Sequence, residues 1–190
     1  TQYRGMPIGI PDGQTATQRP DASLFSYNVL RQDYTEILME YAEVQFILSE
    51  VNGWNDENYR NGVTASMERW GVSDAKITAF VTALPAASEA NVLNQKYVAL
   101  YMQPYEAWAE YRRTGFPNTI LLPGETYPLN NPDSDGNTTY VFTPIPAVTE
   151  MPSRLTYPNT LSTLNGVNYQ AAAANIGGDL ITTKLIWDNN

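Results

Sequence analysis

Apolar residues recur at helical spacing through the middle of the chain and lose that spacing on either side. Residues 34–114 contain two prolines, whereas residues 115–190 contain eight, together with many Asn and Gly residues. Gly115 can end a helix, and Pro117 cannot continue one. The pattern therefore predicts a loop-rich lead-in over 1–33, a helical region over 34–114 and an irregular C-terminal region over 115–190. We expect the last region to pack on the helices as one domain.

The helical region divides into amphipathic segments that stop and start at Gly, Ser and Pro. Helices are expected over about 34–52, over about 56–71, from Ser73 and from Ser88. Pro104 cannot donate a backbone hydrogen bond inside a helix, so the last segment should restart there and end near Arg113. The segments suggest a stack of helical hairpins, although no clean 34-residue repeat is present.

The first helical segment has apolar side chains on more than one face. Its predicted core stripe consists of Ile37, Leu38, Tyr41, Ala42, Leu48 and Val51. Val44, Phe46 and Ile47 lie off that stripe, so the helix is apolar most of the way round, as buried helices are. The chain alone should then expose an apolar patch. The glutamates of this segment are expected to form a solvated acidic face: Glu36, Glu40, Glu43 and Glu50.

Two further expectations concern the aromatic and basic residues of the helices. Trp70 and Trp108 lie on apolar faces at helical spacing, so both are predicted to be buried core residues. Arg112 and Arg113 lie within one or two turns of acidic residues, which predicts ion pairs within the helix.

Charge and composition exclude several classes of function. The chain has 11 basic and 20 acidic residues, a net charge of -9, so a phosphate-binding surface for nucleic acid is not expected. It has no Cys and no His. A Ser-His-Asp triad, a Cys-His dyad and a zinc site of the Cys/His kind are therefore excluded. No glycine-rich phosphate loop is present, and no spacing singles out a pair of catalytic carboxylates. We expect a protein that is not an enzyme.

Aromatic residues off the helical stripes are the better candidates for ligand contact, because aromatic faces can bind apolar sugar faces. Tyr3, Trp54, Tyr127 and Tyr140 each lie in a loop-like stretch and are the predicted ligand-binding residues. Ordinary loop packing is the alternative interpretation for each of them.

The segment NPDSDGN, residues 131–137, is the one candidate for a metal site. Asp133, Asp135 and Asn137 alternate as in a calcium-binding loop. The twelfth position counted from Asp133 is Pro144, where a calcium-binding EF-hand needs a bidentate Glu. These residue types also make ordinary turns. No cofactor is expected, and calcium stays open as an alternative.

Several blocks of the chain follow a recognisable pattern. In the helical region they are LMEYAEVQFILSEV (38–51), NYRNGVTASMERWGV (58–72) and QKYVALYMQPYEAWAEYRRTGFP (95–117). Outside it they are YRGMPIG near the start and, near the end, RLTYP (154–158), NY (168–169) and KLIWDNN (184–190). In this order the blocks resemble the SusD/RagB-type family in its SusD-like branch. Ile186 stands where the family has a Trp, and Pro104 replaces a usual glycine.

The resemblance implies a mainly α, helical-hairpin (tetratricopeptide-like) SusD-type architecture with a long irregular C-terminal region and few short strands. It implies non-enzymatic binding of a nutrient, for which an oligosaccharide is expected, by a surface lipoprotein of the outer membrane in Bacteroidetes. Its partner would be a SusC-like TonB-dependent transporter that takes up the ligand. The chain would be the C-terminal portion, packed against an N-terminal remainder that holds the lipid anchor. A helical-repeat scaffold that binds protein without glycan is the alternative, and a sugar-processing enzyme is the third.

Overall fold

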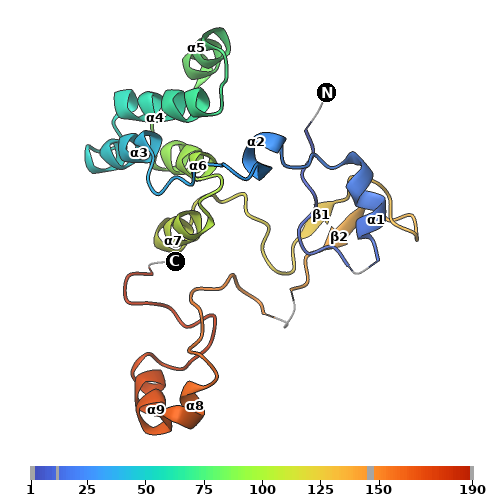
Figure 1. Cartoon of the computed structure of the whole chain (residues 1–190), viewed down its shortest axis with the longest axis vertical. Coiled ribbons are helices and arrows are strands. Elements are labelled where there is room, and N and C mark those ends of the chain that lie inside the picture. The colour runs from blue at the N-terminus through green and yellow to red at the C-terminus, as the bar shows by residue number, and fades with distance from the viewer. Residues whose placement is uncertain (1–2, 12, 145–147, 189–190) are drawn as a thin grey trace. The chain divides into compact units, whose positions relative to one another are not determined.

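The computed structural model describes residues 3–11, 13–144 and 148–188 of the chain. These residues are mainly helical, with short strands, which confirms the predicted fold class (Figure 1). The chain divides into two compact units. The helical unit comprises the described residues of Glu36–Thr119 and Trp187–Asn190, and the mixed unit those of Thr1–Thr35 and Ile120–Ile186. The packing of 115–190 on the helices as one domain stays a prediction.

The helical unit contains five helices whose ends follow from local sequence signals. They are α3 (Tyr41–Val51), α4 (Asp56–Arg69), α5 (Asp74–Ala83), α6 (Glu89–Ala99) and α7 (Pro104–Thr114). The side chains of Asn55 and Ser88 accept hydrogen bonds from backbone N–H groups in the first turns of α4 and α6. Pro104 begins α7 and Gly115 ends it at a φ of 75°, so the predicted restart and stop are confirmed. Among the described residues, no helix has both the length and the apolar character to span a membrane.

The mixed unit has short elements joined by long irregular segments. Its elements are α1 (Thr15–Gln18), the 3-10 helix η1 (Arg19–Asp21), α2 (Tyr27–Leu30), β1 (Thr126–Pro128), β2 (Thr139–Val141), α8 (Leu161–Leu164) and α9 (Gly166–Asn175). Strands β1 and β2 pair antiparallel, with Tyr127 opposite Tyr140. The Gln18 side chain donates to the backbone carbonyl of Asn131 at 2.7 Å and accepts from its N–H at 3.1 Å. These bonds hold the lead-in segment to the loop after β1.

Phe46 is the centre of the apolar core in the helical unit. It is fully buried, in a cluster of buried residues completed by Ala42, Tyr59, Val63, Val92 and Ala99. Helix α3 packs on α4 and α6, as Figure 1 shows. An added Cβ at Gly62 of α4 would lie 3.0 Å from two ring atoms of Phe46. Glycine at this position therefore lets the ring lie directly on the α4 backbone.

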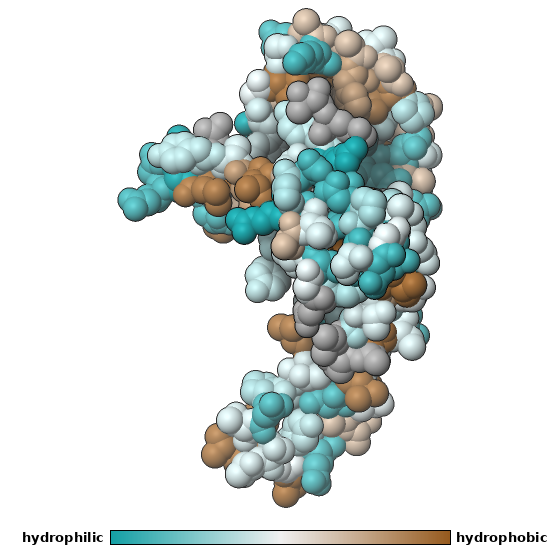
Figure 2. All heavy atoms as spheres, turned by 90° about the vertical axis from the view of Figure 1, so that its right-hand side faces the viewer, coloured by the Kyte–Doolittle hydropathy of each residue, from teal (hydrophilic) through white to brown (hydrophobic). Residues whose placement is uncertain are grey.

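The predicted core stripe of α3 is wrong for most of its members. Leu38 is 88% exposed, and Tyr41, Leu48 and Val51 are also exposed. The buried face of α3 consists instead of Ala42, Gln45, Phe46 and Ser49. Figure 2 shows apolar residues among the polar ones on the surface that it views, so exposed apolar side chains are part of this structure.

Polar residues can take these inward positions on α3 because each has a hydrogen-bond partner. Gln45 Nε2 donates to the Tyr41 hydroxyl at 2.7 Å, and Gln45 Oε1 accepts from Asn58 at 2.8 Å. The Ser49 hydroxyl donates to the backbone carbonyl of Asn55 at 2.8 Å. Such tertiary partners offset the loss of water around buried polar groups and cannot be inferred from the periodicity of one helix.

The solvated acidic face predicted for this segment is also wrong, except at Glu36, which is exposed. Glu40 is buried and pairs with Arg69 at 2.8 Å. Glu50 accepts two hydrogen bonds from Arg113, at 2.7 and 2.8 Å. The half-buried Glu43 lies near Lys96, Glu106 and Glu110, and burial above all raises its pKa. Three of the four glutamates therefore face other helices of the unit.

The two tryptophans predicted as buried are not buried. Trp70 is 39% exposed and makes an edge contact with Tyr101, while Trp108 is half-buried. The Arg112 guanidinium lies 3.9 Å from the ring centroid of Trp108 and 4.5 Å from that of Trp187. The predicted ion pair within α7 is present for Arg113, which contacts Glu110 at 2.7 Å. The contacts of Arg112 with two indole rings are cation–π interactions, which the sequence analysis did not predict.

Replacing Gly62 with Ala should destabilise the helical unit, because the added Cβ would lie 3.0 Å from ring atoms of Phe46, which is fully buried in the core. Overpacking costs about 1–3 kcal/mol, more than the ~1 kcal/mol gained when Ala replaces Gly in a helix. Gly62→Ala should lower the free energy of unfolding in urea titrations. The exposed neighbour Asn61 is the control, and Asn61→Ala should raise it by about 0.5 kcal/mol. A stabilised Gly62→Ala variant would contradict this packing.

Replacing Glu43 with Gln should stabilise the protein at neutral pH and have little effect at acidic pH. Burial raises the pKa of Glu43, so the folded state favours its protonated form. Its contribution to stability is present at low pH and is lost as the pH rises through the folded-state pKa. The Gln side chain resembles the protonated form at every pH. Urea unfolding of Glu43→Gln at pH 4 and pH 7 tests this, with the exposed Glu36→Gln as control. An equal effect at both pH values would refute it.

Candidate functional site

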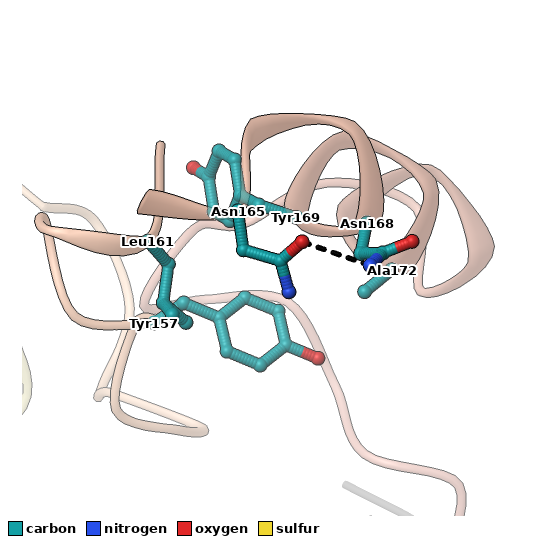
Figure 3. Close-up of a pocket in the computed structure, with 6 residues that line it drawn as sticks. All are labelled: Tyr157, Leu161, Asn165, Asn168, Tyr169 and Ala172. Carbon is teal, nitrogen blue, oxygen red and sulfur yellow. Dashed lines mark hydrogen bonds between the residues drawn. The ribbon is translucent and has the colours of Figure 1, made fainter. Parts of the chain in front are cut away.

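A pocket of about 200 Å3 lies in the mixed unit between the segment before α8 and the face of α9 (Figure 3). Six residues line it, namely Tyr157, Leu161, Asn165, Asn168, Tyr169 and Ala172. None of these lining residues is charged. The pocket therefore combines aromatic rings, aliphatic side chains and neutral amides.

The local sequence explains why these side chains meet. Asn165 connects α8 to α9, and its backbone φ of -148° lies outside the helical region. From Asn165, the positions i+3, i+4 and i+7 are Asn168, Tyr169 and Ala172, which share one face of a helix. Pro158 follows Tyr157 and favours an extended backbone at Tyr157. Tyr157 therefore lies on the segment before α8 and not on the α9 face.

The two tyrosine rings form an edge-to-face pair. Their centroids are 6.0 Å apart and their planes make an angle of 83°. This geometry is one of the two that aromatic pairs prefer. In Figure 3, the hydroxyl of Tyr169 points away from the asparagine pair, while its ring faces the pocket. The rings therefore offer apolar surface to a ligand.

Asp179 connects the two tyrosine segments. Its carboxylate accepts a hydrogen bond from the backbone N–H of Tyr157 at 3.0 Å and another from the Tyr169 hydroxyl at 3.1 Å. It also pairs with Arg154 at 2.9 Å, and both side chains are nearly buried, at 8% and 11% exposure. The hydrogen bond with Asp179 raises the pKa of Tyr169. One carboxylate thus fixes both aromatic residues of the pocket.

Arg154 contributes a second contact to the same arrangement. Its guanidinium carbon lies 4.7 Å from the ring centroid of Tyr157, within the distance of a cation–π interaction. The backbone N–H groups of Ser153 and Arg154 donate to the carbonyl of Ile181, at 2.7 and 3.1 Å. The segment that holds Tyr157 is therefore tied to the segment that follows α9.

The two asparagines on the α9 face are linked to each other. Asn168 Nδ2 donates to Asn165 Oδ1 at 2.8 Å, which uses one donor and one acceptor of the pair (Figure 3). Asn165 Nδ2 and Asn168 Oδ1 have no hydrogen bond to a described residue. The pair therefore offers a donor and an acceptor to a ligand.

A second, smaller pocket lies among the helices of the helical unit. Its volume is about 140 Å3 and its lining is mainly apolar, formed by Phe46, Val63, Ser66, Met67, Phe80, Gln95 and Val98. Gln95 is the one amide in this lining, whereas the first pocket has two asparagines, so the first is the better candidate for a polar ligand.

The four predicted ligand-binding aromatics do not line either pocket. Tyr3 is 88% exposed, and Trp54 is half-buried against the helical core at a φ of 63°. Tyr127 is exposed on β1, whereas Tyr140 on β2 is buried and donates its hydroxyl proton to the carbonyl of Ile8 at 2.6 Å. The structure brings Tyr127 and Tyr140 together as a cross-strand pair. A binding role for these residues stays a prediction.

The carboxylate of Asp133, the main calcium candidate, takes part in the turn around it. It accepts hydrogen bonds from the backbone N–H groups of Asp135 and Asn137, from the Asn137 amide and from Gln14. Hydrogen bonds from the Asn137 side chain and backbone lower its pKa. In the described part of the chain, no group of three acidic residues has the arrangement to hold a metal ion. Calcium binding is untested.

The pocket residues were not among the residues predicted from the sequence to bind a ligand, although several of them belong to the blocks that carry the family resemblance. Arg154 and Tyr157 belong to the block RLTYP, and Asn168 with Tyr169 forms the block NY, both used for the resemblance. Asp179 gave no signal, because it is a lone acidic residue after two glycines. Its partners lie 25 and 10 residues away at Arg154 and Tyr169.

Comparisons with known proteins place the chain in a family. A family model named SusD-like_2 and described as "Starch-binding associating with outer membrane" matches residues 1–158. A solved structure described as "Bacteroidetes AC2a SusD-like" matches with a TM-score of 0.67 and 28% identity, over 87% of this chain and 33% of the other. A second, described as a chitin-binding protein, matches with a TM-score of 0.59 and 29% identity, over 79% and 33%.

The chain thus spans about a third of the length of both solved structures. The comparison with curated proteins found no match. The family match covers more than half of the chain, and the resemblance of the sequence blocks pointed to the same family. The chain belongs to the SusD-like_2 family.

Proposed function

We propose that this chain takes part in non-enzymatic binding of a neutral glycan at the bacterial outer membrane. SusD-like proteins are binding proteins and not enzymes. The family description names starch binding and association with the outer membrane, and one solved neighbour is described as chitin-binding. Both ligands are uncharged polysaccharides, so the comparisons support an uncharged glycan for this chain.

The observation that supports this proposal in the structure is the lining of the Tyr157 pocket. Two tyrosine rings, two asparagine amides and no charged side chain form its wall. Apolar ring faces with a few convergent polar groups are typical of small-molecule sites. Neutral sugars match this wall because they present C–H faces and hydroxyl groups that donate and accept hydrogen bonds. An anionic glycan would find no cation among the lining residues.

For the biological setting, we propose that the whole protein is a surface-exposed lipoprotein that delivers its ligand to a SusC-like TonB-dependent transporter. Support comes from the family description, which names association with the outer membrane.

A protein-binding scaffold without glycan affinity is the second candidate function. It is favoured by the exposed apolar side chains on and beside α3, namely Leu38, Tyr41, Leu48 and Val51. Exposed apolar patches mark interaction surfaces in many soluble proteins. The two functions differ in one measurable property, which is the affinity for free glycans.

Isothermal titration of the chain with a glycan panel tests the proposed function. The panel contains a malto-oligosaccharide, a chitin oligosaccharide and polygalacturonate as the anionic control. We expect heat of binding from at least one neutral glycan and none from the control. The same mixtures, assayed for new reducing ends, should show no turnover. The absence of binding to both neutral glycans would refute glycan binding, and release of reducing ends would refute a purely binding role.

A further inference from the structure

We infer that the Tyr157 pocket is a subsite for a single uncharged sugar ring, with Asn165 and Asn168 as the residues that determine its selectivity. This inference rests on the proposed glycan binding. It adds the location of the site, the size of the ligand and the residues that hydrogen-bond to the ligand. Three features of the pocket support it: its volume, its hydrogen-bonding groups and the contacts that fix its walls.

The volume limits the ligand to about one ring. The pocket measures about 200 Å3, below the roughly 300–1,000 Å3 of sites that bury drug-sized ligands. An extended oligosaccharide cannot enter as a whole. One pyranose ring can occupy the pocket while the rest of a glycan stays outside, so we expect recognition of one unit of the chain.

The free amide groups match the hydroxyl groups of a sugar. Asn165 Nδ2 is an unused donor and Asn168 Oδ1 an unused acceptor, on neighbouring turns of one helix face. Figure 3 shows the Asn165 nitrogen on the side of Tyr157 and its oxygen toward Asn168. A hydroxyl group both donates and accepts, so two adjacent sugar hydroxyls can bond to the pair. The ring of Tyr157 then supplies apolar surface for the C–H face.

The aromatic wall is fixed before a ligand arrives. Asp179 holds the backbone of Tyr157 and the hydroxyl of Tyr169, and Arg154 lies over the Tyr157 ring. A wall that is already ordered loses less conformational entropy on binding than a mobile one. Asp179 and Arg154 are therefore positioning residues, which act through the tyrosines and need no contact with the sugar.

The two walls of the pocket differ in their relation to the family. Arg154 and Tyr157 lie within residues 1–158, which the family model matches. Asn165, Asn168 and Ala172 lie beyond that match. Asn168 nevertheless belongs to the block NY, which resembles the family pattern.

The test uses NMR spectra of the ¹⁵N-labelled whole chain titrated with methyl glucopyranoside, methyl N-acetylglucosaminide and glucuronate. We expect the side-chain NH₂ signals of Asn165 and Asn168 to shift with at least one neutral glycoside, and glucuronate to cause no comparable shift. The double variant Asn165→Ala/Asn168→Ala should lose at least tenfold in affinity for that glycoside. The control Asn175→Ala, at the exposed C-terminal end of the same helix, should bind as the unchanged chain does.

A conservative variant separates the positioning role from a loss of folding. Tyr169→Phe keeps the ring and removes its hydrogen bond to Asp179, so we expect a few-fold loss of affinity with an unchanged far-UV circular dichroism spectrum. Binding of an oligosaccharide that the double asparagine variant leaves unchanged would overturn the subsite and leave the proposed function intact. The absence of binding of every glycan would overturn both.

Discussion

Pairing of buried charges is the constraint on which both units of this protein depend. Lys96 has a side chain only 5% exposed and lies 3.1 Å from Glu110, while Arg154 lies 2.9 Å from Asp179 at similar burial. A buried charge without a partner costs several kcal/mol, roughly 3–5 when one partner of a pair is removed. Lys96 and Glu110 join the consecutive helices α6 and α7, and Arg154 and Asp179 join the segments before α8 and after α9. The elements must therefore take the positions that satisfy the charges.

The blocks that resemble the SusD-like family include several of the charged residues that make such contacts. In the block that ends in RRTGFP, Arg113 bonds to Glu50 and Glu110, and Arg112 lies between two indole rings. In the block RLTYP, Arg154 pairs with the lone Asp179. The motifs thus specify how separate segments are joined. The chain therefore resembles the family in residues that hold the fold together. The pocket arises where one such framework contact holds two tyrosines.

Local signals in the sequence predicted several limits of the helices, because caps, prolines and glycines act on neighbouring residues. The start of the first helix is an exception, since α3 begins at Tyr41 and not near residue 34. Ser88, Pro104 and Gly115 are examples whose predicted roles the structure confirms. The faces of the helices were predicted poorly. The inward residues Gln45 and Ser49 are polar, and their burial depends on partners in the α4 segment that periodicity cannot reveal. The same reason applies to Arg112, whose second indole partner, Trp187, lies 75 residues further along the chain.

The candidate site was missed for a related physical reason. A search for aromatics outside the helical stripes selects isolated rings, such as Tyr3, whereas the pocket needs rings held in a pair by a carboxylate. Tyr169 lies on α9, in a region that was predicted to be irregular, and it was not among the candidates, yet its ring faces a segment from before α8. Among the described residues, Asp179 bonds to the tyrosine segments and to Arg154, whereas the side chains of Asn165 and Asn168 bond to each other. Such a division lets the surface that meets a ligand change in sequence without disturbing the buried ion pair that shapes the pocket.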